Sequence, residues 1–563
     1  ANPRGRVDTN WQILDNVSYT AGRHNWKFGY EFRYTFVDGF FDNGYRGKLS
    51  FNTLDDFIAG VPLSGRQAQG NSSRQTFQSN HSLYAQDSFH LFPRLTVNYG
   101  VRWDYFGVIG EQHDGFSLLD STGALHLVHQ LYPRDLNNFA PRASLAWDVM
   151  GNAKTVLRAG WGVYYDAFSQ DFFVGQLPFN TFNSGPAYNG IGPDAITFSF
   201  APAATLQSGV RVFDPATFAA TDVFTVDQKI RTPYIQVYNL NVQQQLSKTI
   251  AVEVGYVGSA GRKLFRYRDI NQINPATGTT AFPALGFVNQ FESSASSSYN
   301  SVQASLRVRN WHRLTSTLNY TWSHSIDNAS DGQDYVPNAT QPDNSFRPDR
   351  ERASSNFDMR QHLSWTFNYQ LPDSQHLHWL SSGWSMDGVL ALSAGQPFNV
   401  NYLFEGDFNH SGEFFGRPDL VGNPFVGTRG AGQFLNLAAF RVPCTTDALG
   451  NCTGNQHFGN LGRNAFVGPS YKNFDFSLVK NNKLTERMKM QLRVDVFNLL
   501  NHPNLANPLW PNFGVDFLQN GISTTGTGKG FLPLTTTPDV GTGNPFLGGG
   551  GSRNVQLAVR LSF

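Results

Sequence analysis

The end of the chain alternates strictly between apolar and polar side chains. In residues 552–563 every second position from Val555 to Phe563 is apolar, and small or polar residues stand between them. Residues 487–497 repeat the pattern, with Lys, Gln, Arg and Asp on the second face. A period of two residues predicts a β-strand with two different faces. Because unpaired buried charge is costly, we expect water on the charged face and an apolar environment on the other.

The same alternation recurs along the chain and predicts a protein built from strands. Many of these strands span about ten residues, which is near the length that a tilted strand needs to cross a bilayer and more than the usual five or six. The expected strands comprise residues 26–34, 95–105, 141–148, 155–165, 238–243, 250–256, 302–308, 314–322, 363–371, 384–393 and 472–479.

Short and long connections alternate between these strands. The short ones lie around Asn152 and at residues 247–248, 311–313, 373–383 and 481–485. The long ones are rich in Gly and Pro and comprise residues 110–139, 168–232, 326–355, 404–470 and 504–551. This asymmetry is typical of outer-membrane barrels, which have short periplasmic turns and long external loops.

We therefore predict an all-β fold, a transmembrane antiparallel up-and-down β-barrel with its apolar faces toward lipid and its polar faces toward a hydrated interior. Aromatic residues at strand ends, such as Trp322 and Trp365, suit an interfacial girdle. The alternative is a secreted β-sandwich, propeller or jelly roll. Such folds seldom place Arg, Lys, Asp and Gln on one whole face in every strand, which favours the barrel.

Composition agrees with this prediction and narrows the function. The 43 basic and 42 acidic residues leave a net charge of +1, so no basic field points to nucleic acid. Charged residues make up 15 % and aromatic residues 14 % of the chain, with 54 Gly, which suits a sheet with many turns. No apolar run reaches the roughly 18 residues of a spanning helix. The first residues lack the pattern of a signal peptide, so we expect that it has been removed or that the chain begins within a longer protein.

The two cysteines, Cys444 and Cys452, stand eight positions apart in a loop rich in Pro, Gly and Asn. We expect a disulfide that closes an exposed loop in an oxidising compartment, and the alternative is a pair of free thiols. A metal site would need more ligands than this region offers, so we expect neither a metal nor another cofactor. Polar residues on the inward faces could form a catalytic field, but the lining of a hydrated interior explains them without any reaction.

Several segments resemble the TonB-dependent outer-membrane transporters, in particular the Oar-like branch, whose longer members carry a carboxypeptidase-regulatory-like domain. The resemblance is carried by residues 458–464 (FGNLGRN), 471–480 (YKNFDFSLVK), 491–504 (QLRVDVFNLLNHPN) and 553–563 (RNVQLAVRLSF). The closing Phe563, with Leu561 and Val559, looks like the signal by which the barrel-assembly machinery recognises such strands.

The resemblance implies a bacterial outer-membrane location in a Gram-negative cell and active uptake of a bulky solute, such as an oligosaccharide, a peptide or an iron chelate. Family barrels have roughly 22 strands and a plug. About 15 to 17 strands are expected here from strand length, so residues 1–563 look like the C-terminal part of the barrel domain. The plug that contacts the TonB complex and the regulatory-like domain are then expected outside this chain. The partners implied are lipid, the assembly machinery, the TonB complex and the solute.

External loops are the expected ligand contacts, because rigid walls position them. Six aromatic residues in or beside these loops could stack on a sugar ring or a siderophore: Tyr164, Tyr165, Phe404, Phe414, Phe415 and Trp510. The alternative for each is packing within its own loop. At the level of the whole protein, the alternatives to a transporter are a passive porin and a surface adhesion or scaffold barrel. We expect no enzymatic activity.

Overall fold

The computed structural model describes residues 4–41, 48–51, 53–61, 64–66, 73–170, 180–181, 192–193, 221–283, 285–330, 341–373, 378–400, 402–403, 415–430, 433–441, 443–446, 452–454, 457–504, 531–532 and 552–563. Within this part of the chain, nearly all regular structure is β-strand, as the alternation predicts. The helices that occur there are short: α1 (Leu54–Ala59), η2 (Pro348–Glu351), α3 (His378–Ser381) and η3 (Leu437–Ala439). No helix among the described residues is long and apolar enough to cross a membrane.

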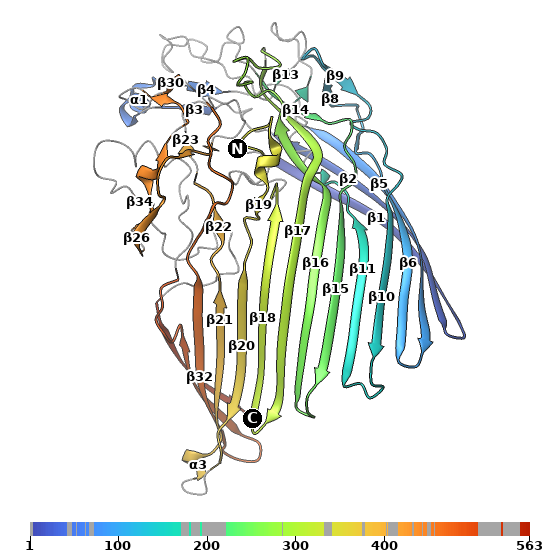
Figure 1. The fold of residues 1–563 in the computed structure, drawn as a ribbon, viewed down its shortest axis with the longest axis vertical. Coiled ribbons are helices and arrows are strands. Elements are labelled where there is room, and N and C mark those ends of the chain that lie inside the picture. Colours follow the sequence, from blue (N-terminus) through green and yellow to red (C-terminus); the bar gives the residue numbers. More distant parts are fainter. Residues whose placement is uncertain are drawn as a thin grey trace.

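One large sheet forms the body of the molecule (Figure 1). Its long strands are β1 (Arg4–Ala21), β2 (His24–Phe41), β5 (Arg74–Phe92), β6 (Leu95–Phe106), β10 (Phe139–Asp148), β11 (Thr155–Tyr165), β15 (Tyr234–Gln245), β16 (Ile250–Asp269), β17 (Leu285–Trp311), β18 (Leu314–Asp327), β20 (Gln361–Gln370), β21 (Trp384–Ser393), β32 (Tyr471–Lys483), β33 (Lys489–Phe497) and β35 (Asn554–Ser562).

Each long strand pairs antiparallel with the next long strand along the chain, so the sheet is an up-and-down meander. Tight turns join the strands at one end, which we call the hairpin end. The first of them follows Ala21 opposite His24 and contains Gly22 at φ +61°, a backbone conformation that a two-residue hairpin turn requires and that glycine adopts without strain. The long connections all leave the opposite, loop end of the sheet (Figure 1).

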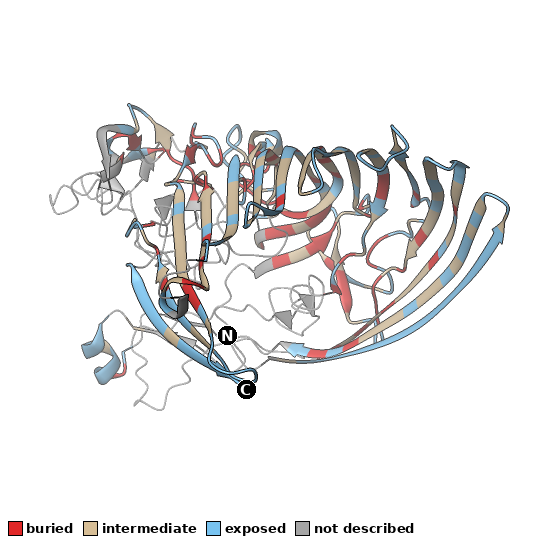
Figure 2. Ribbon diagram, turned by 90° about the horizontal axis from the view of Figure 1, so that it is seen from below, coloured by how far each residue is buried: buried red, intermediate tan, exposed pale blue. Residues whose placement is uncertain are grey.

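The sheet has 18 strands in the described residues, against the 15 to 17 that strand length predicts. The difference lies in three short strands at the loop end: β7 (Gly110–Glu111), β14 (Thr221–Val226) and β19 (Ala353–Ser354). β14 runs parallel to β17, whereas the other pairings of the sheet are antiparallel. The sheet curves into an open arc (Figure 2). β1 and β35 form its two edges and are not paired with each other in the described residues.

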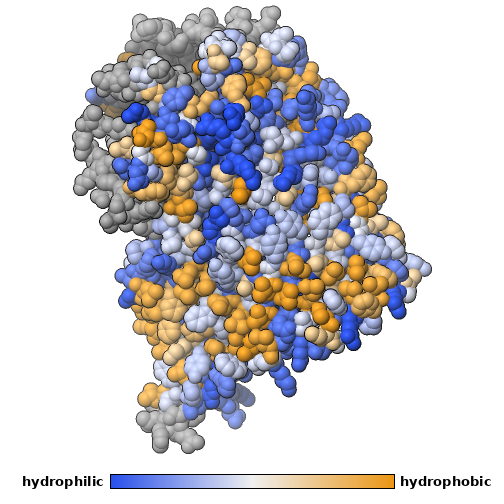
Figure 3. Space-filling model, viewed as in Figure 1, coloured by the Kyte–Doolittle hydropathy of each residue, from blue (hydrophilic) through white to orange (hydrophobic). Residues whose placement is uncertain are grey.

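The two faces of the arc differ as the alternation predicts. On the convex face apolar side chains point outward, so that Trp11 is 67 % exposed, Leu561 54 % and Phe563 98 %. Hydrophobic residues form a band across the half of the molecule near the hairpin end (Figure 3). On the concave face Asp495 is buried, and its carboxylate accepts hydrogen bonds from Ser477 and Arg493. The predicted division into an apolar outer and a polar inner face is confirmed.

The loop end carries small strand pairs and the buried apolar clusters. These strands are β3 (Lys48–Ser50) with β4 (Ser64–Arg66), β8 (Phe116–Leu119) with β9 (Leu125–Val128), β12 (Asn180–Thr181) with β13 (Gly192–Pro193), β22 (Pro397–Phe398) with β31 (Phe466–Val467), β23 (Tyr402–Leu403) with β24 (Phe415–Gly416), β25 (Asp419–Leu420) with β28 (Phe440–Arg441), β26 (Phe425–Gly430) with β27 (Gln433–Asn436) and β34 (Phe531–Leu532), and β29 (Thr445–Thr446) with β30 (Cys452–Gly454).

Candidate functional site

A pocket of about 640 Å³ lies on the concave wall, lined by residues of β1, β5, β6, β10, β11 and β15. We call it the wall pocket. Among the residues that line it, these bring polar or aromatic side chains from the inner face: Tyr84, Gln86, Asn98, Arg102, Arg142, Ser144, Tyr164 and Asn239. Its size falls in the range of small-molecule sites, roughly 300–1,000 Å³.

Strand register places Arg142 at the middle of the wall pocket. Arg142 on β10 stands opposite Gly100 on β6 and opposite Gly162 on β11. Its guanidinium carbon lies 4.2 Å from the centre of the Tyr164 ring, a cation–π contact. A Cβ atom on Gly162 would come within 3.1 Å of the Arg142 side chain and 3.2 Å of the Tyr164 ring. Glycine at this position therefore leaves the space in which the two side chains stack.

The second arginine of the wall pocket is already neutralised. Arg102 donates from Nε to Asp104 at 2.7 Å and from Nη2 to Glu31 at 3.1 Å. Asp104 is buried and also accepts from the Ser82 hydroxyl at 2.6 Å, while Gln12 donates to Glu31. These bonds form a hydrogen-bond network across β1, β2, β5 and β6. Because the network holds these charged side chains in fixed positions, Arg102 has few N–H donors left to bind a ligand.

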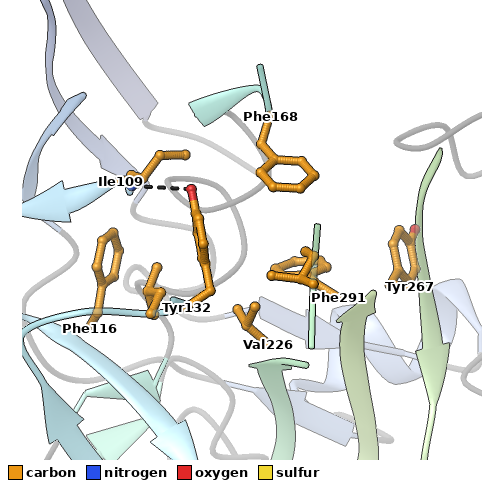
Figure 4. Packing of buried hydrophobic residues seen from close by; sticks show 9 residues of the cluster. Ile109, Phe116, Tyr132, Phe168, Val226, Tyr267 and Phe291 are labelled. Carbon is orange, nitrogen blue, oxygen red and sulfur yellow. Dashed lines mark hydrogen bonds between the residues drawn. The ribbon is translucent and has the colours of Figure 1, made fainter. Parts of the chain in front are cut away.

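Above the wall, at the loop end, connections from different parts of the chain pack together around Tyr132 (Figure 4). The centroids of the Tyr132 and Phe168 rings are 5.7 Å apart in an edge-to-face arrangement. The Tyr132 hydroxyl accepts a hydrogen bond from the backbone N–H of Ile109 at 3.2 Å. Phe291, at the loop end of β17, belongs to the same buried cluster. Burial of each large apolar side chain contributes about 1.5–3 kcal/mol, so this cluster holds several connections together at the mouth of the arc.

Two buried ion pairs tie further loops together at the same end. Arg417 donates from its two terminal nitrogens to both oxygens of Glu351, at 2.7 and 2.6 Å, and both side chains are buried. Arg463 pairs with Asp327 and donates from Nε to the backbone carbonyl of Glu351 at 2.8 Å. The pairs join the connections β18–β20 and β21–β32 to each other and to the end of β18. We call this group the mouth network.

A third carboxylate of the mouth network has an altered acidity. Asp343 lies 3.6 Å from Arg417 and is fully enclosed by protein. Burial raises the pKa of Asp343 above its ordinary value, because loss of hydration penalises the charged form by more than the nearby Arg417 favours it. The network therefore combines two well-paired carboxylates with one that is poorly solvated.

A comparison with known protein families assigns nearly the whole chain to one family. The outer membrane beta-barrel domain family matches residues 1–543. The chain belongs to this family. This outer-membrane barrel protein accordingly has its place in the bacterial outer membrane. The apolar convex face is then the lipid-facing surface and the hairpin end the periplasmic one.

Solved outer-membrane proteins are similar in structure to this barrel chain. The outer membrane transporter YddB from Escherichia coli matches with a TM-score of 0.54 and 11 % identity, over 99 % of this chain and 55 % of its own. The ferripyoverdine receptor of Pseudomonas aeruginosa gives a TM-score of 0.46 at 10 % identity, over 99 % and 48 %. The FrpB iron transporter from Neisseria meningitidis gives 0.44 at 10 % identity, over 99 % and 55 %. The barrel chain thus spans about half the length of these proteins. No curated protein sequence matches it significantly.

The structure describes three of the six aromatic residues that the sequence suggests as ligand contacts, and it does not bring these three together in one site. Tyr164 lies in the wall pocket, on a strand and not in a loop. Tyr165 follows it on the opposite face of β11, 5.5 Å from the ring of Tyr234. Phe415 begins β24 at the loop end. The remaining three lie outside the described residues: Phe404, Phe414 and Trp510.

The cysteine region and the closing strand have defined positions. Cys444 is disulfide-bonded, and the one other cysteine in the sequence is Cys452. The pairing of β29 with β30 sets Thr446 opposite Cys452 at the loop end. Val559, Leu561 and Phe563 lie on the lipid-facing side of β35, where they are accessible. Their role as an assembly signal stays a prediction.

Sequence reasoning missed Arg142 and the mouth network. Arg142 follows Pro141 in an ordinary alternating segment, and only the register of three strands brings it beside Tyr164 and between two glycines. Arg417 and Glu351 are 66 positions apart, and Arg463 and Asp327 are 136 apart. A local signal did exist for the wall pocket, since Gly160 and Gly162 interrupt a strand where glycine often marks a close approach.

Proposed function

We propose that this outer-membrane barrel chain is the wall and mouth of a TonB-dependent transporter that takes up a bulky polar solute. The observation that carries the proposal is the ordered mouth above a polar wall pocket. Loops are held over the interior by the Tyr132 cluster and by the paired Arg417 and Arg463. A pore that only sieves by size needs an open passage, whereas a transporter needs an enclosed site that holds one solute.

The proposal assigns residues 1–563 to the barrel domain of a longer protein. In it, the inner-membrane TonB complex acts on a plug supplied outside this chain, and the barrel-assembly machinery recognises the closing strand with Phe563. The similarity of the fold to YddB over about half of that transporter's length supports this assignment. Oligosaccharides, peptides and iron chelates are the solute classes considered.

Uptake in cells tests the proposal. Cells that lack the protein should lose accumulation of one solute class from a labelled panel of oligosaccharides, peptides and ferric chelates. Cells that keep the protein but lack the TonB complex should lose it equally, because the energy comes from that complex. Restoring the gene provides the control.

Two outcomes would replace the proposal. Accumulation that persists without the TonB complex, together with a large steady conductance of the full-length protein in planar bilayers, would make it a passive porin. Loss of surface attachment with intact accumulation would make it an adhesion barrel.

A further inference from the structure

The charges of the wall pocket do not cancel. Arg102 and Arg33 together balance the two carboxylates Asp104 and Glu31. The carboxylate of Asp87 lies on the outer face of β5, where it pairs with His24 at 2.6 Å and accepts from the Tyr99 hydroxyl at 2.9 Å, so it adds no charge to the interior. Arg142 remains, exposed to the interior and without an ion pair to any residue that the structure describes. The wall pocket therefore presents one uncompensated positive charge.

The surroundings of Arg142 favour a planar anion. Stacking on Tyr164 holds the guanidinium over the ring, with its N–H donors around the rim of its own plane. Gly100 and Gly162 stand opposite Arg142 on the two neighbouring strands and place no side chain beside it. A guanidinium that is supported on one face and open at its edge pairs best with a carboxylate, which can accept two parallel hydrogen bonds.

The rest of the lining is neutral and rich in hydrogen-bonding groups. Asn98 donates to the Ser144 hydroxyl at 3.2 Å, and Asn239 and Gln86 extend this amide-rich surface. Amides and hydroxyls both donate and accept, as sugar hydroxyls do. A polyanionic chelate would need several cations and a zwitterionic peptide would need an uncommitted carboxylate. Neither is offered by the described lining.

We propose that the wall pocket binds an acidic oligosaccharide, a polyhydroxylated solute with a carboxylate that pairs with Arg142. The inference rests on the proposed function, since it names the solute class of that transporter. Amide and hydroxyl groups of Asn98, Ser144 and Asn239 bind the hydroxyls, and the Tyr164 ring keeps the Arg142 guanidinium in place.

Two compounds that differ in a single group test the proposal. Lactobionate and lactitol share the same galactosyl-polyol skeleton, and lactobionate carries a carboxylate where lactitol carries a CH₂OH group. Titration calorimetry on the purified full protein in detergent micelles is expected to give at least tenfold tighter binding of lactobionate. R142Q should remove that preference, because a charge-assisted hydrogen bond is worth about 10- to 100-fold in affinity. R142K should keep part of the preference for lactobionate, because lysine keeps the positive charge but lacks the two parallel N–H donors of the guanidinium.

The chain offers a matched control. Arg158 lies on the same inner face of β11, outside the wall pocket, and donates to Gln243 at 3.0 Å. R158Q should leave both affinities unchanged, and circular dichroism and the heat-dependent gel shift should show every variant folded. Equal binding of the two compounds, no binding of either, or an unchanged preference in R142Q would overturn the proposal.

Failure of the pocket and failure of the transporter are separable in these experiments. Preference for lactobionate that depends on Arg142 in the purified protein, with no TonB-dependent accumulation in cells, would overturn the proposed function while supporting the pocket. TonB-dependent accumulation without such preference would overturn the pocket alone.

Discussion

The mouth network should be sensitive to loss of one partner and tolerant of loss of both. Glu351→Leu would leave Arg417 charged and enclosed, with its two Glu351 bonds of 2.7 and 2.6 Å removed. Breaking a buried pair from one side costs about 3–5 kcal/mol. Asp343, 3.6 Å from Arg417, still offsets part of the charge, so we expect a value near the lower end, about 3 kcal/mol.

The loss should appear as local opening of the loops. Hydrogen exchange followed by mass spectrometry reports opening segment by segment, and about 3 kcal/mol corresponds to roughly a hundredfold loss of protection. Peptides covering residues 343–351, 417–420 and 461–463 should lose it, while β5 and β6 keep theirs. In the double variant Glu351→Leu, Arg417→Met most of the protection should return, because neither member of the pair stays buried alone and Asp343, whose pKa burial already raises, takes up a proton once Arg417 is gone.

The same connection holds a matched control. Arg347 and Asp349 form an ion pair at 2.9 Å in which both side chains are more than half exposed. Exposed pairs contribute little, so Arg347→Gln should leave protection unchanged. Equal protection in Glu351→Leu and Arg347→Gln would contradict the stabilising role of the mouth network. So would a double variant that lost as much protection as the single variants Glu351→Leu and Arg417→Met added together.

Three further predictions concern other parts of the barrel. The raised pKa of Asp343 means that the folded state binds its proton more tightly than the unfolded chain, so its contribution to loop stability falls as the pH rises from about 4 toward the raised pKa. Asp343→Asn should remove this pH dependence of loop stability. Hydrogen exchange of residues 341–351 at pH 4 and pH 7 measures the dependence in both proteins. Leu557→Arg, on the lipid-facing side of β35, should destabilise the barrel by about 2–4 kcal/mol in urea unfolding from vesicles, while Gln556→Arg, opposite Asp495 on the inner face, should be tolerated. Cys444→Ser should loosen the loop that carries β29 and β30 by about 2–3 kcal/mol, as faster exchange of residues 443–446 would show.

Where lipid imposes a pattern, the sequence predicts the structure. β33 and β35 are fully apolar on one face, and the structure places that face outward. β1 was missed because Thr9 and Asp15 interrupt its apolar positions, and β5 because Ser79, His81 and Asp87 occupy outward positions. Single polar residues of this kind are tolerated near the ends of a spanning strand, and they break the two-residue period that the prediction requires.

Where lipid imposes no pattern, strand length and the site could not be predicted. β17 begins at Leu285, but only its residues 302–308 alternate clearly between apolar and polar. The serine-rich part before them does not alternate because it is surrounded by water and protein and does not face lipid. The sequence places Tyr164 near the end of the expected strand 155–165, beside a long loop, and the register of β11 adds that it faces the inner wall. Its partner Arg142 is brought near by strand register, which depends on contacts between distant parts of the chain.

The length of β17 carries the wall of the sheet well beyond the lipid. A strand of 27 residues runs about 90 Å at roughly 3.3 Å per residue, or about 70 Å in height at the usual tilt of about 40°. The hydrocarbon layer takes up about 25 Å of that height, which leaves about 45 Å of this strand outside the hydrocarbon. In the proposed transporter, a solute that binds at the loop end of β17 would therefore still be far from the lipid, and it would have to move along the inner wall toward the hairpin end to reach Arg142.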